Sequence, residues 1–420
     1  MRGVSPDQAL GRMLLALALA IAVGHILSIG LSRLRQPTVL AQILAGVVLG
    51  PTLVGAIPGA EELLFPAPVT QALAAIGSVG LVLFMFMVGV ELDLSAVRRM
   101  RGRTAAISAG ALGLPFALGL GAAAVLYESH RTVAGAEVDR LPFFLFVATA
   151  LSITAFPVLA RIIRDHRMER SPVAQMATAS AAVQDGAGWL LLAVALAAMS
   201  ADGSTQLLHL VAWSAGLVVV LLVVVRPLLR RTSSTTTVLV GLAACAGATQ
   251  LIGLHSALGA FLFGALIPGD ARAAVAERFE RMIMPTTAHV LLPLFFLGPG
   301  LHVNLRALDG GALVALALIM ACACGGKLVG GAIPARLGGA SWHDAKVIAV
   351  LLNTRGLVEL IVLEVGRVEG ILDPMLYSVL VTMALTTTLM TGPLLYRLEG
   401  SPESRVEVTR PRVLAAEAQP

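Results

Sequence analysis

Four charged residues lie in the middle of long apolar runs: Asp185, Lys327, Arg355 and Glu359. A charged side chain at the centre of a bilayer costs roughly 2.5–3.5 kcal/mol even on a lenient insertion scale. Such residues must therefore face one another or a water-filled cavity, and by default they mark an ion pathway. The chemistry that they could perform is reversible binding of protons or small cations by a buried carboxylate.

The four residues differ in how strongly the sequence favours a functional role over a structural one. Asp185 has no charged neighbour on its own helix, so we expect it to be functional, with a purely structural role as the alternative. Lys327 could act in the same site or only neutralise a carboxylate. Arg355 and Glu359 are four residues apart on one helix, so a plain stabilising pair fits them as well as a functional one.

Two apolar runs contain helix breakers near their centres. In the run 149–163, Pro157 removes a backbone donor and disfavours helical geometry at the residue before it. In the run 351–362, Gly356 is a weaker breaker. Polar residues beside the two breaks are Ser152, Thr154, Asn353 and Thr354. Backbone carbonyls freed at membrane depth are tolerated where they line a cavity or meet other protein.

Composition predicts that the elements carrying these residues are membrane helices. Hydrophobic residues make up 57% of the 420 positions and charged residues only 13%, whereas soluble domains carry roughly 25% charged residues. A helix needs about 20 apolar residues to cross the hydrocarbon. Thirteen runs qualify, or twelve if one of the short runs 255–269 and 285–300 does not cross. The runs are 10–32, 37–57, 70–94, 105–127, 141–163, 172–199, 206–226, 235–253, 255–269, 285–300, 311–335, 344–366 and 371–396.

The two interrupted runs are the fifth and twelfth in this count, so they cross the membrane in opposite directions. Interrupted helices at corresponding places in two inverted halves indicate a transporter site near the midplane. Asp185 lies one run after the first break and Lys327 one run before the second. We therefore predict an all-α integral membrane protein of about thirteen spans, with inverted repeats and a site where the breaks meet.

Arginine clusters predict the orientation. An outside N-terminus places most arginines in cytoplasmic loops, as the positive-inside rule requires, and places the C-terminus in the cytoplasm. The arginines counted inside are Arg33, Arg35, Arg98, Arg99, Arg101, Arg103, Arg164, Arg167, Arg170, Arg226, Arg230, Arg231, Arg272, Arg278 and Arg281; those outside are Arg131, Arg140, Arg306 and Arg367. Their short clusters between apolar runs argue against a nucleic-acid partner. Lipid is the expected surroundings, and the cell (inner) membrane the expected location.

We expect residues 1–400 to form one transmembrane domain and residues 401–420 a disordered cytoplasmic tail, with no soluble domain attached. The segment 270–284 is amphipathic and is expected to lie on the cytoplasmic face.

Several segments, in order, resemble the second family of monovalent cation:proton antiporters. They are QPTVLAQILAGVVLGP (36–51), LVLFMFMVGVELDL (81–94), SITAFPVLARII (152–163), PLFFLGPGLHVNL (293–305) and NTRGLVELIVL (353–363). The third and last are similar to segments of plant cation/proton exchangers and their bacterial relatives. The resemblance implies the sodium/proton antiporter fold, with two crossed, unwound helices in a core near 105–199 and 311–396. The remaining helices would form the dimerisation scaffold, so a homodimer is expected.

In that family, an acidic pair or an Asn-Asp pair on the sixth span binds cation and proton alternately. The matching residues are Gln184 and Asp185, a pair that resembles the glutathione-gated potassium efflux transporters and leaves Na⁺ or K⁺ open. The family lysine facing the aspartate corresponds to Lys327. A further basic position of the family is occupied here by His302.

The expected mechanism is competition at one carboxylate. Burial disfavours the charged form of Asp185 and a nearby Lys327 favours it, so a proton and a cation could alternate there. Ser152 and Thr154 would add neutral oxygens for the cation, with Gln184 beside them. Coupling and charge compensation are assigned to Lys327, Glu359, Arg355 and Asn353. One carboxylate predicts one proton per cation, hence electroneutral exchange, with no cofactor beyond the transported Na⁺ or K⁺ and H⁺.

Three alternatives remain open at this stage. A cation channel could also be lined by a Gln-Asp pair and unwound helices. A secondary transporter of another solute could share the architecture, although it would need further substrate-binding groups. An integral membrane enzyme is disfavoured, because the eight histidines show no metal-ligand spacing and no Ser/His/Asp set lies on nearby turns. We therefore expect no enzymatic activity.

Overall fold

The computed structural model describes residues 6–33, 36, 38–92, 101–199, 203–231 and 234–399. The predicted tail 401–420 and the arginines Arg35, Arg98 and Arg99 lie outside the described residues. The helices are α1 (Pro6–Arg33), α2 (Thr38–Leu49), α3 (Ala60–Leu64), α4 (Ala67–Glu91), α6 (Arg101–His130), α7 (Arg140–Ser152), α8 (Phe156–Asp165), α9 (Pro172–Ala197), α10 (Gly203–Val220), η1 (Leu221–Val225), α11 (Arg226–Arg231), α12 (Thr235–Ile252), α13 (Ser256–Ala265), α14 (Gly269–Met282), α15 (Met284–Thr286), η2 (Thr287–Leu291), α16 (Leu292–Leu301), η3 (Leu305–Ala307), α17 (Gly310–Leu337), α18 (Trp342–Leu352), α19 (Leu357–Val368) and α20 (Pro374–Glu399). Strands β1 (Thr132–Val133) and β2 (Ala136–Glu137) pair antiparallel in a hairpin.

The prediction of an all-α membrane protein is confirmed. Among the described residues, ten helical segments are long and apolar enough to cross a membrane, and α2 and α13 are shorter apolar helices. The remaining predicted run holds α18 and α19, which a break separates. The run 37–57 is helical only to Leu49, because turns follow at Gly50 and continue to Gly59.

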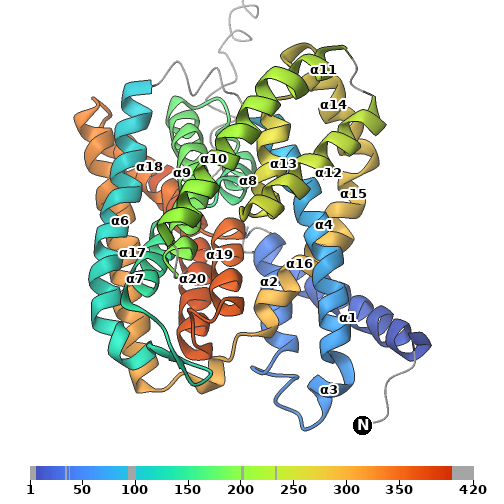
Figure 1. Cartoon of the computed structure of the whole chain (residues 1–420). Helices are drawn as coiled ribbons and strands as arrows, with labels where there is room; N and C mark the ends of the chain where they lie inside the picture. The colour runs from blue at the N-terminus through green and yellow to red at the C-terminus, as the bar shows by residue number, and fades with distance from the viewer. Residues whose placement is uncertain are drawn as a thin grey trace, which may run out of the picture.

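The helices pack in two groups (Figure 1). The core group consists of α6, α7, α8, α9, α17, α18, α19 and α20, with α6 and α17 side by side at its edge. The scaffold group consists of α1, α2, α4, α12, α13 and α16. Helix α10 contacts both α9 and α12, so it links the two groups.

Glycines bring helices close together inside each group. In the scaffold, a Cβ added to Gly89 on α4 would lie 2.1 Å from the carbonyl oxygen of Phe261 on α13. In the core, a Cβ added to Gly110 on α6 would lie 2.4 Å from the carbonyl oxygen of Gly330 on α17. Such backbone contact is what small residues permit in membrane helices. Among the described glycines, none makes an equally close approach between the two groups.

Two helices of the core are broken at membrane depth. Helix α7 ends at Ser152 and α8 begins at Phe156, with Pro157 in its first turn. Helix α18 ends at Leu352 and α19 begins at Leu357, directly after Gly356. Both breaks fall where the sequence predicts them. In the first, Pro157 cannot donate a backbone hydrogen bond to the preceding turn; in the second, Gly356 adopts a positive φ of 156° directly before α19.

Candidate functional site

The two breaks meet, and each satisfies backbone groups of the other. The N–H of Ala155 donates to the carbonyl oxygen of Thr354 over 3.1 Å. The hydroxyl of Thr154 lies 3.0 Å from the carbonyl oxygen of Leu352, at the end of α18. On α20, the hydroxyl of Thr388 lies 2.6 Å from the carbonyl oxygen of Arg355 and accepts from its N–H over 3.2 Å. These hydrogen bonds hold the two unwound segments in one arrangement.

Asp185 lies on α9 beside this crossing and is 2% exposed. Its Oδ1 accepts from the N–H of Phe156 over 3.4 Å. Phe156 is the first residue of α8, so the carboxylate sits at a helix N-terminus, where unpaired N–H groups and the helix dipole favour negative charge. Its second oxygen, Oδ2, is buried and has no hydrogen-bond partner. A buried carboxylate oxygen without a donor is free to accept a proton or to contact a cation.

Lys327 on α17 is fully buried and holds the residue before Asp185. Its Nζ donates to Thr154 Oγ1 over 2.5 Å and to Gln184 Oε1 over 2.7 Å. Thr154 Oγ1 and Gln184 Oε1 are themselves 2.9 Å apart. Within the described residues, the hydrogen bonds of Lys327 therefore reach two of the side chains, Thr154 and Gln184, that the sequence assigned to cation and proton binding.

Arg355 and Glu359 form a fully buried ion pair with an Nη1–Oε1 distance of 3.0 Å. The same Nη1 donates to the carbonyl oxygen of Ala150 over 2.9 Å, and Nη2 donates to that of Leu151. Both carbonyls belong to the last turn of α7, where intrahelical donors are lacking and positive charge is favourable. Glu359 lies in the first turn of α19, the end that favours negative charge.

The remaining predicted residues lie near the crossing with different partners. The hydroxyl of Ser152 donates to the carbonyl oxygen of Thr149 over 2.9 Å, inside its own helix. Asn353 caps the end of α18 and its Oδ1 is buried without a partner. His302, at the end of α16, lies with its Nδ1 2.9 Å from the carbonyl oxygen of Gly298 and 3.8 Å from Glu364 Oε2.

The four charges form a balanced set. Two cations, Lys327 and Arg355, and two anions, Asp185 and Glu359, are buried at the crossing. If all four are ionised their sum is zero. Adding one proton to Asp185 or adding one monovalent cation beside it changes the sum by the same single charge. No group of three or more metal-ligating side chains occurs in the described part of the chain.

A cavity of about 760 Å³ leads toward this site between the core and the scaffold. Phe156, Ala160 and Arg164, spaced four residues apart along one face of α8, line it on the core side. Gln42 on α2 and Glu91 on α4 line it on the scaffold side. The cavity therefore follows α8 from its charged end to Phe156, whose N–H contacts Asp185.

Sequence reasoning did not single out Thr388, Leu352 or the backbone of Phe156, although each contacts a site residue. Backbone groups carry no sequence signal of their own. The run of three threonines at 386–388 in an apolar helix could have pointed to Thr388.

A family model described as "Sodium/hydrogen exchanger, transmembrane" matches residues 17–398. The Na(+)/H(+) antiporter NhaS4 of Synechocystis sp. is 33% identical over 399 residues, which cover 91% of this chain and 96% of that protein. Cation/H(+) antiporter 20 of Arabidopsis thaliana is 36% identical, with 90% of this chain and 47% of that protein covered. The K(+)/H(+) antiporter 1 of Saccharomyces cerevisiae is 30% identical, with 90% and 45% covered.

The chain thus spans about half the length of the plant relatives that it matches. A solved structure with a similar fold is the sodium proton antiporter MjNhaP1 of Methanocaldococcus jannaschii. Its TM-score is 0.62 at 13% identity, over 93% of this chain and 98% of that chain.

Proposed function

Because this chain is a multi-pass membrane protein that belongs to the sodium/hydrogen exchanger family, we propose that it exchanges a monovalent cation for H⁺ by alternating access. The observation that carries the proposal is the position of Asp185. Its carboxylate is buried at the crossing of two broken helices, beside a cavity, with one oxygen unpartnered. The names of the relatives, which include Na⁺/H⁺ and K⁺/H⁺ antiporters, support the same class of reaction.

Asp185 is the residue that takes H⁺ and Na⁺ or K⁺ in turn, and no cofactor takes part. A proton on Oδ2 neutralises the carboxylate, whereas a cation needs it ionised, so the two cargoes exclude each other. Lys327 holds Thr154 and Gln184 while Asp185 is free of cation. An arriving cation competes with this ammonium for the same oxygens, so Lys327 adjusts the affinity of the site. Ser152 and Asn353 shape the surrounding backbone.

The exchange is electroneutral with one proton per cation. The buried set carries the same charge with either cargo, because each adds one positive charge to a sum of zero. Arg355 and Glu359 stay paired and hold the ends of α7 and α19 during transport.

The end of the molecule that carries Arg164 and α14 faces the cytoplasm, which places the N-terminus outside and the C-terminus inside the cell membrane. The cavity along α8 is then the inner access path, and this conformation is inward-facing. The protein works as a homodimer in which each copy carries a complete site, since the site residues come from the core helices of one chain.

The test is proton movement in proteoliposomes that contain the purified protein and a pH-sensitive dye. Pulses of Na⁺, K⁺ and Li⁺ should each be compared, across the neutral pH range, for an alkaline or acid shift that follows the imposed cation gradient. A proton flux that follows none of these gradients would refute the exchange. A sizeable current on solid-supported membranes would refute the electroneutral stoichiometry alone.

A further inference from the structure

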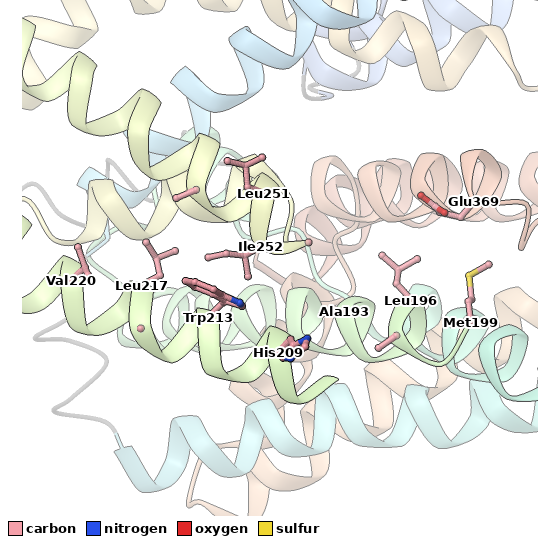
Figure 2. Close-up of a pocket in the computed structure, with 14 residues that line it drawn as sticks. Ala193, Leu196, Met199, His209, Trp213, Leu217, Val220, Leu251, Ile252 and Glu369 are labelled. Carbon is pink, nitrogen blue, oxygen red and sulfur yellow. The ribbon is translucent and has the colours of Figure 1, made fainter. Parts of the chain in front are cut away.

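A second cavity, of about 830 Å³, lies at the opposite end of α9 from the inner access path. Figure 2 shows His209 and Trp213 on α10 turned toward Ala193 on α9 and toward Ile252 on α12, with Glu369 at the far edge. This outer cavity is bounded by core residues on one side and by α10 and α12 on the other. In the proposed orientation it lies on the outer side of the site.

One face of α9 leads from the outer cavity to the site. Asp185, Trp189 and Ala193 are spaced four residues apart and therefore lie one above another along the helix. Ala193 lines the outer cavity and Asp185 lies at the crossing, so Trp189 stands between them. Trp189 is 2% exposed.

The ring of Trp189 stacks on the imidazole of His255, with ring centroids 5.4 Å apart and an interplanar angle of 30°. His255 directly precedes α13, and Gly253, two residues earlier, lines the outer cavity. The stack therefore lies next to two residues that line that cavity, one turn of α9 away from Ala193 and one turn away from Asp185.

The two rings belong to different helix groups. Trp189 is part of the core, whereas α13 is fixed to the scaffold helix α4 where Gly264 meets the backbone of Phe86. His255 is itself held in place, since its Nδ1 accepts from the N–H of Ala257 over 3.2 Å and caps α13. A neutral imidazole with its proton on Nε2 satisfies this geometry.

We propose that Trp189 and His255 form the closed outer gate of the exchanger, which must separate for Asp185 to reach the outer cavity. The proposal rests on the proposed function, and it identifies two residues that bind no ion yet determine which side the site faces. Stacking stabilises the inward-facing state, because the contact exists only while the core and the scaffold keep this relative position. Weakening it shifts the population toward the outward-facing state.

The test measures how fast a thiol reagent reaches position 185 from each side of the membrane, and it does not depend on ion transport. Asp185→Cys is introduced into a chain in which Cys245, Cys322 and Cys324 are replaced by serine. A membrane-impermeant cationic methanethiosulfonate is then applied to intact cells, or to inverted vesicles for the inner side. The labelling rate of the chain that lacks all three native cysteines but retains Asp185 is subtracted as background.

Two substitutions of His255 separate the roles of its ring. His255→Asn keeps an N-cap acceptor and removes the stacked ring, whereas His255→Phe keeps a ring and removes the cap. We expect outside labelling to be about two- to tenfold faster with His255→Asn than with His255→Phe, which is the range given by one aromatic pair. Inside labelling should not rise.

In a second pair of variants, outside labelling should likewise be faster with Trp189→Ala, which removes the ring, than with Trp189→Phe, which keeps one. Equal outside rates within both pairs would overturn the gate, and so would an equal rise on both sides, which indicates general loosening. If the unsubstituted protein shows no cation-dependent proton flux but the labelling difference persists, the proposed exchange is wrong while the gate stands.

Discussion

The backbone N–H of Ala155 donates to the carbonyl oxygen of Thr354 over 3.1 Å, which joins the break of one core helix to the break of the other. The two breaks are far apart in sequence and belong to antiparallel helices. Each leaves backbone groups without intrahelical partners, and at membrane depth these must be satisfied by protein. The crossing meets this need and places four helix ends around Asp185, Lys327, Arg355 and Glu359.

Replacing Asp185 with Asn should reduce exchange to background, because an amide oxygen neither takes a proton in this pH range nor offers a charge to the cation. The protein should remain folded, since the amide can still accept from the N–H of Phe156. The measurement is dye-reported proton flux in proteoliposomes, with size-exclusion chromatography as the folding control. Exchange at a rate comparable to the unsubstituted protein would remove Asp185 from the site.

Replacing Lys327 with Gln should change the pH dependence of exchange more than its cation selectivity. A neutral amide can still hold Thr154 and Gln184, but the positive charge that favours the ionised carboxylate is lost. Protons should then compete better, so exchange should fall off at a higher pH than in the unsubstituted protein. The measurement is the rate of exchange with Na⁺ and with K⁺ at several pH values. An unchanged pH dependence together with an altered Na⁺/K⁺ selectivity would contradict the prediction.

Replacing Arg355 with Met should destabilise the protein strongly, by about 3–5 kcal/mol, because Glu359 becomes a buried charge without a partner. The last carbonyls of α7 lose their donors as well. The double variant Arg355→Met with Glu359→Leu should lose less, since no unpaired charge remains. Thermal unfolding in detergent compares the two, and a double variant less stable than the single one would show that the pair stabilises by more than charge balance.

Replacing Gly89 with Ala should destabilise the scaffold, because the added Cβ would lie 2.1 Å from a backbone oxygen on α13. Gly247 on α12 provides the matched control, since a Cβ there meets nothing within 4 Å. In the control, Gly→Ala should be neutral or stabilise by roughly 0.5–1 kcal/mol, as in other helix interiors. Tolerance of alanine at both positions, judged by thermal stability, would contradict the packing described above.

Asp373, in the loop before α20, should give a pH-dependent contribution to stability. Partial burial raises the pKa of its carboxyl, but hydrogen bonds from His130 and from the N–H groups of Leu376 and Met375 outweigh this and hold the pKa below its ordinary value. A lowered folded-state pKa stabilises the protein above the ordinary value of about 4, and this contribution is lost as pH falls through the folded-state pKa.

The matched variant is Asp373→Asn, which keeps an N-cap acceptor and removes the charge. Its melting temperature should lie below that of the unsubstituted protein near neutral pH, and the difference should shrink as the pH approaches the acid range. A difference that is constant with pH would assign the effect to geometry, not to charge.

The sequence predicted the elements of the site better than the contacts within it. Pro157 and Gly356 located both breaks because their effect on the backbone is local. The four buried charges were found because apolar surroundings make a charge conspicuous. The Arg355–Glu359 contact was expected from helical spacing on one helix, but Arg355 lies in the break before α19, so the pair joins the unwound segment to the first turn of that helix.

Other contacts depend on tertiary packing, which spacing along one helix does not encode. Lys327 was expected to face Asp185, yet its hydrogen bonds reach Thr154 and Gln184 instead. The hydroxyl of Ser152, which was expected to supply an oxygen to the cation, donates to a carbonyl within α7, and its lone pairs stay available to accept. The stack of Trp189 on His255 joins segments 66 positions apart, and no local pattern predicts it.

The distribution of glycines has a mechanical consequence. Backbone-to-backbone contacts stiffen the core and the scaffold separately, while the surface between them is made of side chains, a linking helix and two cavities. Relative movement of the two groups is therefore easiest along the interface between them, and it does not require any helix to bend. Substitutions that enlarge side chains at this interface should slow the conformational change between inward-facing and outward-facing states, while the packing within the core and within the scaffold stays unchanged.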